Sequence, residues 1–162
     1  MRKKTAYMGL FLALALICSY IESFFSFGIP GIKLGLTNIV VVWLLYLAGA
    51  KEAFLISMLR IILSGFMFTN LFSILYSLAG GISSFLVMFL LKKTNKLKCI
   101  SISLCGGITH NIAQIILAVF IVNSINVLFY IPVLLISGMI TGLIIGIISQ
   151  EMIIRLRNRF RF

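Results

Sequence analysis

The distribution of positive charge constrains this chain more than any other feature of its sequence. All but two of its 14 Lys and Arg residues lie in clusters that separate long apolar stretches. The clusters are Arg2, Lys3 and Lys4; Lys51; Lys92, Lys93, Lys96 and Lys98; and Arg155, Arg157, Arg159 and Arg161. A membrane-spanning helix needs about 20 apolar residues, and basic loops stay on the cytoplasmic side. The pattern predicts a multi-pass cell-membrane protein with cytoplasmic N- and C-termini.

Composition excludes an ordinary soluble domain. Hydrophobic residues make up 62% of the chain and charged residues 10%, whereas soluble domains contain about half and about a quarter, respectively. The net charge of +11 would also suit a nucleic-acid-binding protein. However, the cations flank apolar stretches and form no separate basic domain, so we expect a lipid bilayer and no nucleic acid as the environment. We expect residues 1–162 to form a single integral membrane domain.

Breaker residues and stretch lengths predict an all-α bundle of six transmembrane helices. The expected helices cover residues 5–27, 34–48, 53–68, 72–91, 99–122 and 130–155. Gly28, Pro30 and Gly31 should end the first helix, and residues 49–52 should form a tight cytoplasmic turn. The second and third helices are short for a full crossing, so a hairpin that crosses only partly is an alternative.

Small residues indicate where helices approach each other closely. Gly138, Gly142 and Gly146 recur every fourth residue, which places them on one face of the last helix and favours internal packing. The first helix carries a smaller face of Ala6, Gly9 and Ala13. Packing within the bundle and docking of a partner subunit are both compatible with that face.

Ionisable and amide side chains at membrane depth are the candidate functional residues, because such groups are costly in a bilayer. The candidates are Glu22, Lys33, Asn38, Arg60, His110, Asn111 and Gln114. The predicted topology places most of them in the outer half, as in a pocket open to the outside. Structural roles are the alternatives: Arg60 would pair with Glu22, His110 would bond a backbone carbonyl in the core, and Asn38 would cap a helix.

Other residue types argue against catalysis. The chain has one His and no Asp, so we expect neither a metal site nor a cofactor. Cys18, Cys99 and Cys105 lack metal-binding spacing and should be small buried hydrophobes. A phosphate-binding glycine loop, a nucleophile elbow and paired carboxylates are also missing from the sequence. We therefore expect a protein that is not an enzyme.

Aromatic residues near the predicted outer side have two possible roles. They would line a ligand pocket with apolar walls, or they would contact lipid at the membrane interface. The residues concerned are Phe24, Phe25, Phe27, Phe68, Phe72 and Tyr76.

Several motifs, in this order, resemble the Gx transporter family, which is also labelled heptaprenyl diphosphate synthase component I. They are IPGIKLGLTNI at residues 29–39, LYLAGAKEA at 45–53 followed by Arg60, GGITHNIAQ at 106–114 and VLLISGMITG at 133–142. The chain is also similar to the substrate-binding S components of energy-coupling factor (ECF) vitamin transporters. That resemblance implies six helices, a site near the outer surface, and docking of a coupling subunit through Ala6, Gly9 and Ala13. Gly9 departs from the alanine pairs that are common there.

These observations and the resemblance together favour an S-component-like subunit for uptake of a vitamin-like or other small molecule. ATPase and coupling subunits would energise it, and its substrate-binding residues would be Lys33, Asn38, Arg60, His110, Asn111 and Gln114. One alternative is an accessory membrane subunit in isoprenoid or quinone synthesis, and another is a structural subunit of a membrane redox complex. The family's synthase label sits poorly with the sequence, because prenyl diphosphate synthases resemble one another in Asp-rich magnesium motifs that this chain lacks.

Overall fold

The computed structural model describes residues 2–24 and 35–156, with side chains from residue 4 onward. This part of the chain is all-helical and confirms the six predicted α-helices. The helices are α1 (Arg2–Ser23), α2 (Asn38–Leu47), α3 (Ala50–Phe68), α4 (Leu71–Lys93), α5 (Cys99–Val122) and α6 (Ile131–Leu156), with a 3₁₀ helix, η1 (Ile125–Tyr130), before α6.

The predicted boundaries hold for α5 but not for the start of α3. Residues 50–52 were expected in a turn, yet α3 begins at Ala50. The positive φ of Gly49, 119°, turns the backbone so that the helix can begin at the next residue. The Gly49 carbonyl accepts a hydrogen bond from the Ala53 N–H group at 3.1 Å. Glu52 then lies in the first helical turn, where a carboxylate is favoured by the helix dipole.

Other predicted helix boundaries also differ from the structure. The connection between the fifth and sixth helices contains the 3₁₀ helix η1, and Pro132 lies in the first turn of α6, where proline is tolerated. The first helix was predicted to reach residue 27, but α1 ends at Ser23 and Phe24 lies in a turn; residues 25–27 and the predicted turn after them lie outside the described residues. The second helix was predicted from residue 34, but residues 35–37 are not helical and α2 begins at Asn38.

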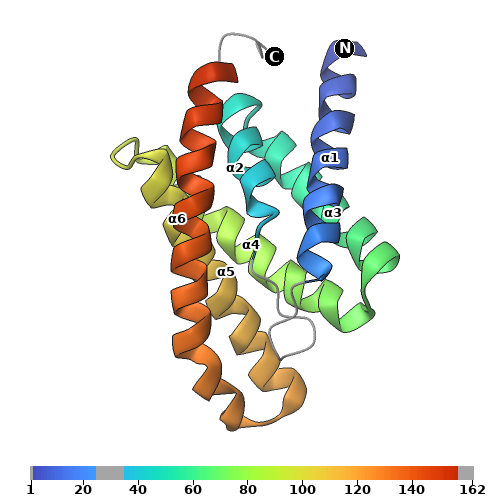
Figure 1. Cartoon of the computed structure of the whole chain (residues 1–162), viewed down its shortest axis with the longest axis vertical. Helices are drawn as coiled ribbons and strands as arrows, with labels where there is room; N and C mark the ends of the chain where they lie inside the picture. The colour runs from blue at the N-terminus through green and yellow to red at the C-terminus, as the bar shows by residue number, and fades with distance from the viewer. Residues whose placement is uncertain (1, 25–34, 157–162) are drawn as a thin grey trace.

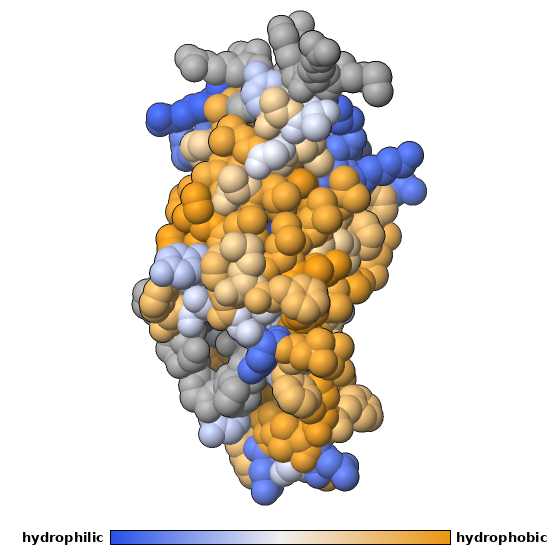
Figure 2. Space-filling model, turned by 90° about the vertical axis from the view of Figure 1, so that its right-hand side faces the viewer, coloured by the Kyte–Doolittle hydropathy of each residue, from blue (hydrophilic) through white to orange (hydrophobic). Residues whose placement is uncertain are grey.

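The lengths of the helices show a multi-pass membrane protein. Four segments are long and apolar enough to span a bilayer, namely Lys4–Ser23, Leu71–Lys93, Cys99–Val122 and Ile125–Leu156. The 10 residues of α2 extend only about 15 Å, roughly half of a hydrocarbon core. Figure 2 shows apolar side chains over most of one face. Six full crossings and the cytoplasmic position of the termini stay predictions.

The helices place most of the basic regions together. The start of α1, the α2–α3 connection and the end of α6 lie toward the same end of the molecule (Figure 1). The two longest helices, α5 and α6, run side by side along its long axis (Figure 1). The predicted sidedness of the chain requires this arrangement.

The glycine stripe of α6 packs inside the bundle, as the sequence predicted, and the structure shows that its neighbour is α5. A Cβ added at Gly107 would overlap the carbonyl oxygen of Gly138, and one added at Gly142 would lie 2.9 Å from Leu104 Cα. Ser103 Oγ also donates to the Gly142 carbonyl at 2.8 Å. Such close backbone contact requires glycine, so the backbones of α5 and α6 pack directly against each other.

The apolar core surrounds α2. Val40, Val42 and Leu44 of this short helix are at most 1% exposed, and the core also includes Phe11 and Met88 from α1 and α4. A helix that is apolar on every side is expected to be enclosed. The first residue of α2, Asn38, therefore lies where this apolar core ends, and polar side chains gather beyond it.

Candidate functional site

Glu22 ties the end of α1 to the residues that lead into α2. Its Oε1 accepts hydrogen bonds from the backbone N–H groups of Gly35 and, at 3.2 Å, Leu36. The side chain is only 1% exposed, and Oε2 has no hydrogen-bond partner among the described residues. Half of this carboxylate thus has a structural role, and the other oxygen makes no hydrogen bond to a described residue.

Arg60 is a fully buried cation in the middle of α3. It is 1% exposed, and its Nε and Nη2 have no hydrogen-bond partner in the part of the chain that the structure describes. Glu22 is close enough to act electrostatically on its charge. Within the described residues the two nevertheless form no direct ion pair, whereas Lys4–Glu52 and Glu151–Arg155 do. The alternative of a direct Glu22–Arg60 pair is therefore not what the structure contains.

His110 projects from α5 into the space between α2 and α4. A Cβ added at Gly80 of α4 would lie 2.8–2.9 Å from three atoms of the imidazole ring. On the other side, a Cβ at Gly35 would meet His110 Cδ2 at 3.5 Å and Asn38 Nδ2 at 3.3 Å. The absence of a side chain at Gly80 thus leaves room for the imidazole ring. His110, Asn38 and Gly35, whose N–H group bonds to Glu22, therefore form one cluster.

Asn38 and Gln114 extend this cluster in two directions. Asn38 is 5% exposed, and its Nδ2 lies 3.4 Å from Ser84 Oγ on α4. Gln114, one turn beyond His110 on the same face of α5, is 0% exposed. Neither of its amide atoms has a partner among the described residues, so it offers both a donor and an acceptor.

Asn111 faces away from this cluster, although it follows His110 directly. Its Nδ2 donates to the Leu134 carbonyl at 2.6 Å and lies 3.3 Å from Ser137 Oγ, both on α6. Neighbouring residues on a helix point about 100° apart, so the two side chains meet different helices. The structure places Asn111 in the α5–α6 contact rather than with the other predicted site residues.

The predicted site residues therefore divide into groups. Asn38 and His110 are brought together, the charge of Glu22 acts on Arg60 without direct contact between described atoms, and Gln114 lies one turn after His110 on α5. Lys33 lies outside the described residues. Ser84 was not among the predicted site residues. The signal that could have identified it is the spacing of Ser77, Gly80 and Ser84, which places all three on one face of α4.

The aromatic candidates mostly face outward. Phe24 is 70% exposed and Phe72 57% exposed, as lipid-contacting residues would be, whereas Tyr76 is 4% exposed. The ring of Phe68 packs 5.2 Å from that of Tyr20. Phe25 and Phe27 lie outside the described residues.

The described residues contain no group of three His, Cys, Asp or Glu side chains that would hold a metal ion. Among the cysteines, Cys99 is buried, whereas Cys18 and Cys105 are only partly buried. The polar cluster offers charged and neutral hydrogen-bonding groups. It can therefore hold a ligand by hydrogen bonds and charge.

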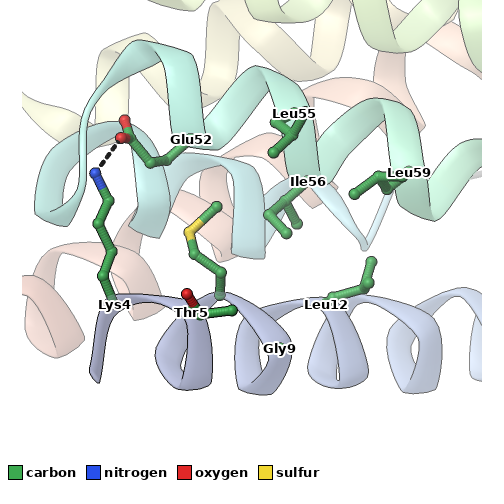
Figure 3. Close-up of a pocket in the computed structure, with 9 residues that line it drawn as sticks. Lys4, Thr5, Gly9, Leu12, Glu52, Leu55, Ile56 and Leu59 are labelled. Atoms are coloured by element: carbon green, nitrogen blue, oxygen red, sulfur yellow. Dashed lines mark hydrogen bonds and ion pairs between the residues drawn. The ribbon is translucent and has the colours of Figure 1, made fainter. Parts of the chain in front are cut away.

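A second feature is an apolar groove of about 500 Å³ between α1 and α3. Figure 3 shows Gly9 and Leu12 of α1 opposite Leu55, Ile56 and Leu59 of α3, with the 2.5 Å Lys4–Glu52 ion pair at one end. Met8 also lines the groove. Ala6, Gly9 and Ala13 are exposed, and a Cβ at Gly9 would touch nothing within 4 Å. The small face of α1 is thus not used for packing among the described residues.

Comparison with known proteins gives a family. The sequence model of the family described as Heptaprenyl diphosphate synthase component I matches residues 11–152. Searches of the curated proteins and of the solved structures found no match.

Proposed function

The chain belongs to the heptaprenyl diphosphate synthase component I family, and on this premise we propose that it is the substrate-binding subunit of a membrane uptake system. One observation carries the proposal: Arg60 and Gln114 are fully buried, yet retain polar atoms without partners among the described residues. Burying such groups unpaired costs several kcal/mol in an apolar medium. Their persistence at membrane depth is typical of a binding site.

The substrate is a small molecule held by hydrogen bonds and charge. Arg60 offers N–H donors, Glu22 Oε2 offers an acceptor, and Gln114 offers both kinds of group. The apolar core around α2 closes the cluster on one side. The task of the site is capture rather than chemical conversion.

Energy for uptake comes from partner subunits. The sequence has no phosphate-binding glycine loop, so ATP hydrolysis resides in a separate ATPase, with a coupling subunit between the two. Support for a docking surface comes from the exposed small face of α1 (Ala6, Gly9 and Ala13) beside the α1–α3 groove. A partner helix can approach such a face closely.

Co-purification tests the proposal. The affinity-tagged chain should retain ATPase and coupling subunits when it is extracted from its native membrane in mild detergent. Gly9→Leu should lose them, because the new side chain fills the docking face. Ile147→Trp is the matched control, since Ile147 is 48% exposed on α6, away from α1. Absence of any ATPase from the wild-type preparation would contradict the proposal.

The family's description favours one other function, that of an accessory subunit of a prenyl diphosphate synthase. The chain would then lack a catalytic share, because it contains no Asp to bind magnesium diphosphate. Co-purification of a soluble prenyl synthase subunit, with thermal stabilisation by prenyl diphosphates alone, would favour this second function.

A further inference from the structure

Glu22 of α1 and Arg60 of α3 are opposite charges that act on each other electrostatically, yet they form no ion pair within the described residues. Glu22 and Arg60 are each 1% exposed. Glu22 uses Oε1 for the backbone of Gly35 and Leu36 and leaves Oε2 without a partner among the described residues. Arg60 Nε and Nη2 also have no hydrogen-bond partner among the described residues. The cluster thus offers one acceptor with a negative charge and one donor group with a positive charge.

Charge balance restricts what such a cluster can hold. A ligand with only a negative charge would gain from Arg60 but would lie within the field of the Glu22 carboxylate, in surroundings that screen charge poorly. A ligand with only a positive charge would gain from Glu22 but would be repelled by Arg60. A diphosphate brings several negative charges to a single guanidinium. A ligand that carries one charge of each sign satisfies both side chains and leaves no buried charge uncompensated.

We propose that the ligand of this site is a small zwitterion, whose carboxylate binds Arg60 and whose ammonium group binds Glu22 Oε2. This inference rests on the proposed function, because it names the ligand class of the same site. Both contacts are charge-assisted hydrogen bonds, the stronger class of such bonds. Both amide atoms of Gln114 are unpartnered among the described residues. Gln114 therefore forms hydrogen bonds with polar groups on the rest of the ligand.

Thermal stabilisation of the purified protein by free amino acids tests the ligand class. Each amino acid is compared with its amide, which lacks the carboxylate, and with its N-acetyl derivative, which lacks the ammonium charge. We expect at least one free amino acid to raise Tm. Its two derivatives should bind about 10–100-fold more weakly, as expected from losing one hydrogen bond to a charged group.

Two variants distinguish ligand contact from a structural role. Glu22→Gln keeps an acceptor for the Gly35 and Leu36 N–H groups but removes the negative charge. Binding of the free amino acid should fall, and the N-acetyl derivative should become the better ligand. Arg60→Gln should shift the preference the opposite way, toward the amide. Glu52→Gln, in the exposed pair between the same two helices, is the control and should change neither preference.

Several results would overturn this inference. One is equal binding of a free amino acid and its singly charged derivatives; another is stabilisation by neutral molecules or diphosphates that depends on Arg60. A third is no stabilisation of the wild-type protein by any free amino acid. None of these results would contradict the uptake function, which is tested separately by co-purification of the ATPase.

Discussion

Helices α1 and α3 carry two pairs of opposite charge, and the two pairs are built differently. Lys4 and Glu52 meet directly at 2.5 Å, with side chains 50% and 20% exposed (Figure 3). Glu22 and Arg60 are each 1% exposed and make no direct ion pair within the described part of the chain. The exposed pair is closed, where closure contributes little. The buried pair makes no direct contact, although a contact there would contribute most to stability. A buried pair without direct contact is what the proposed binding site requires.

The largest expected effect concerns the backbone contacts of Glu22. Glu22→Ala removes the acceptor for the Gly35 and Leu36 N–H groups and should lower the free energy of unfolding by about 1–3 kcal/mol for each orphaned donor. Glu22→Gln keeps an acceptor and should stay close to the wild type. Detergent-induced unfolding of the ligand-free protein measures both. Equal destabilisation by the two variants would show that the negative charge, rather than the acceptor, stabilises the fold.

The second effect concerns Arg60. Arg60→Gln should weaken binding of any ligand that stabilises the wild-type protein by about 10–100-fold. Stability of the ligand-free protein should change little, because no direct ion pair is broken. Titration of ligand against Tm gives both quantities, with Lys4→Gln as the control. A loss of about 3–5 kcal/mol in the ligand-free protein would instead indicate a closed structural pair.

The third prediction compares two amides of α5. Gln114→Leu, a change of similar size, should weaken ligand binding by about 1–3 kcal/mol and leave the fold intact. Asn111→Leu should show the reverse, because Asn111 Nδ2 bonds to the Leu134 carbonyl of α6. Affinity is measured beside a melting curve for each variant. If Gln114→Leu lowers only stability, this face of α5 serves helix packing.

The smallest effect concerns the exposed pair. Lys4→Gln or Glu52→Gln should lower stability by about 0.2–1 kcal/mol, and added salt should reduce the difference. The hydrogen bond from Lys4, and then that from its own backbone, lower the pKa of Glu52 from its usual 4.5. The contribution is therefore complete above pH 4.5 and is lost as the pH falls through the lower pKa of the folded state. A pH-independent difference between wild type and Lys4→Gln would contradict this assignment.

Local sequence signals predicted the helices well because hydropathy and breaker residues act over a few residues. The bounds of α5 agree at both ends. The start of α3 was wrong because Gly49 was read as the first residue of a longer turn, whereas its positive φ lets the helix begin at the next residue. The number of membrane crossings is harder to infer, because α2 is only 10 residues long.

The candidate site was predicted in composition but not in arrangement. Polar residues within apolar stretches are easy to find in a sequence, because placing them in a bilayer costs free energy. Arg60, His110 and Gln114 could therefore be predicted. The role of Asn111 was not visible, because the difference between facing α4 and facing α6 depends on how α5 is rotated. The bonds from Gly35 and Leu36 to Glu22 were not visible either, because backbone donors carry no sequence signature.

The sequence by itself determined the class of this protein, its helices and the small set of polar residues that a bilayer would not tolerate without a reason. Each of these follows from the free energy of transferring local groups between water and hydrocarbon. Only the tertiary structure decided that Lys4 and Glu52 close into a pair while Glu22 and Arg60 stay apart. That outcome depends on which groups come into contact when α1, α2 and α3 pack: Glu22 Oε1 accepts from the Gly35 and Leu36 N–H groups and not from Arg60.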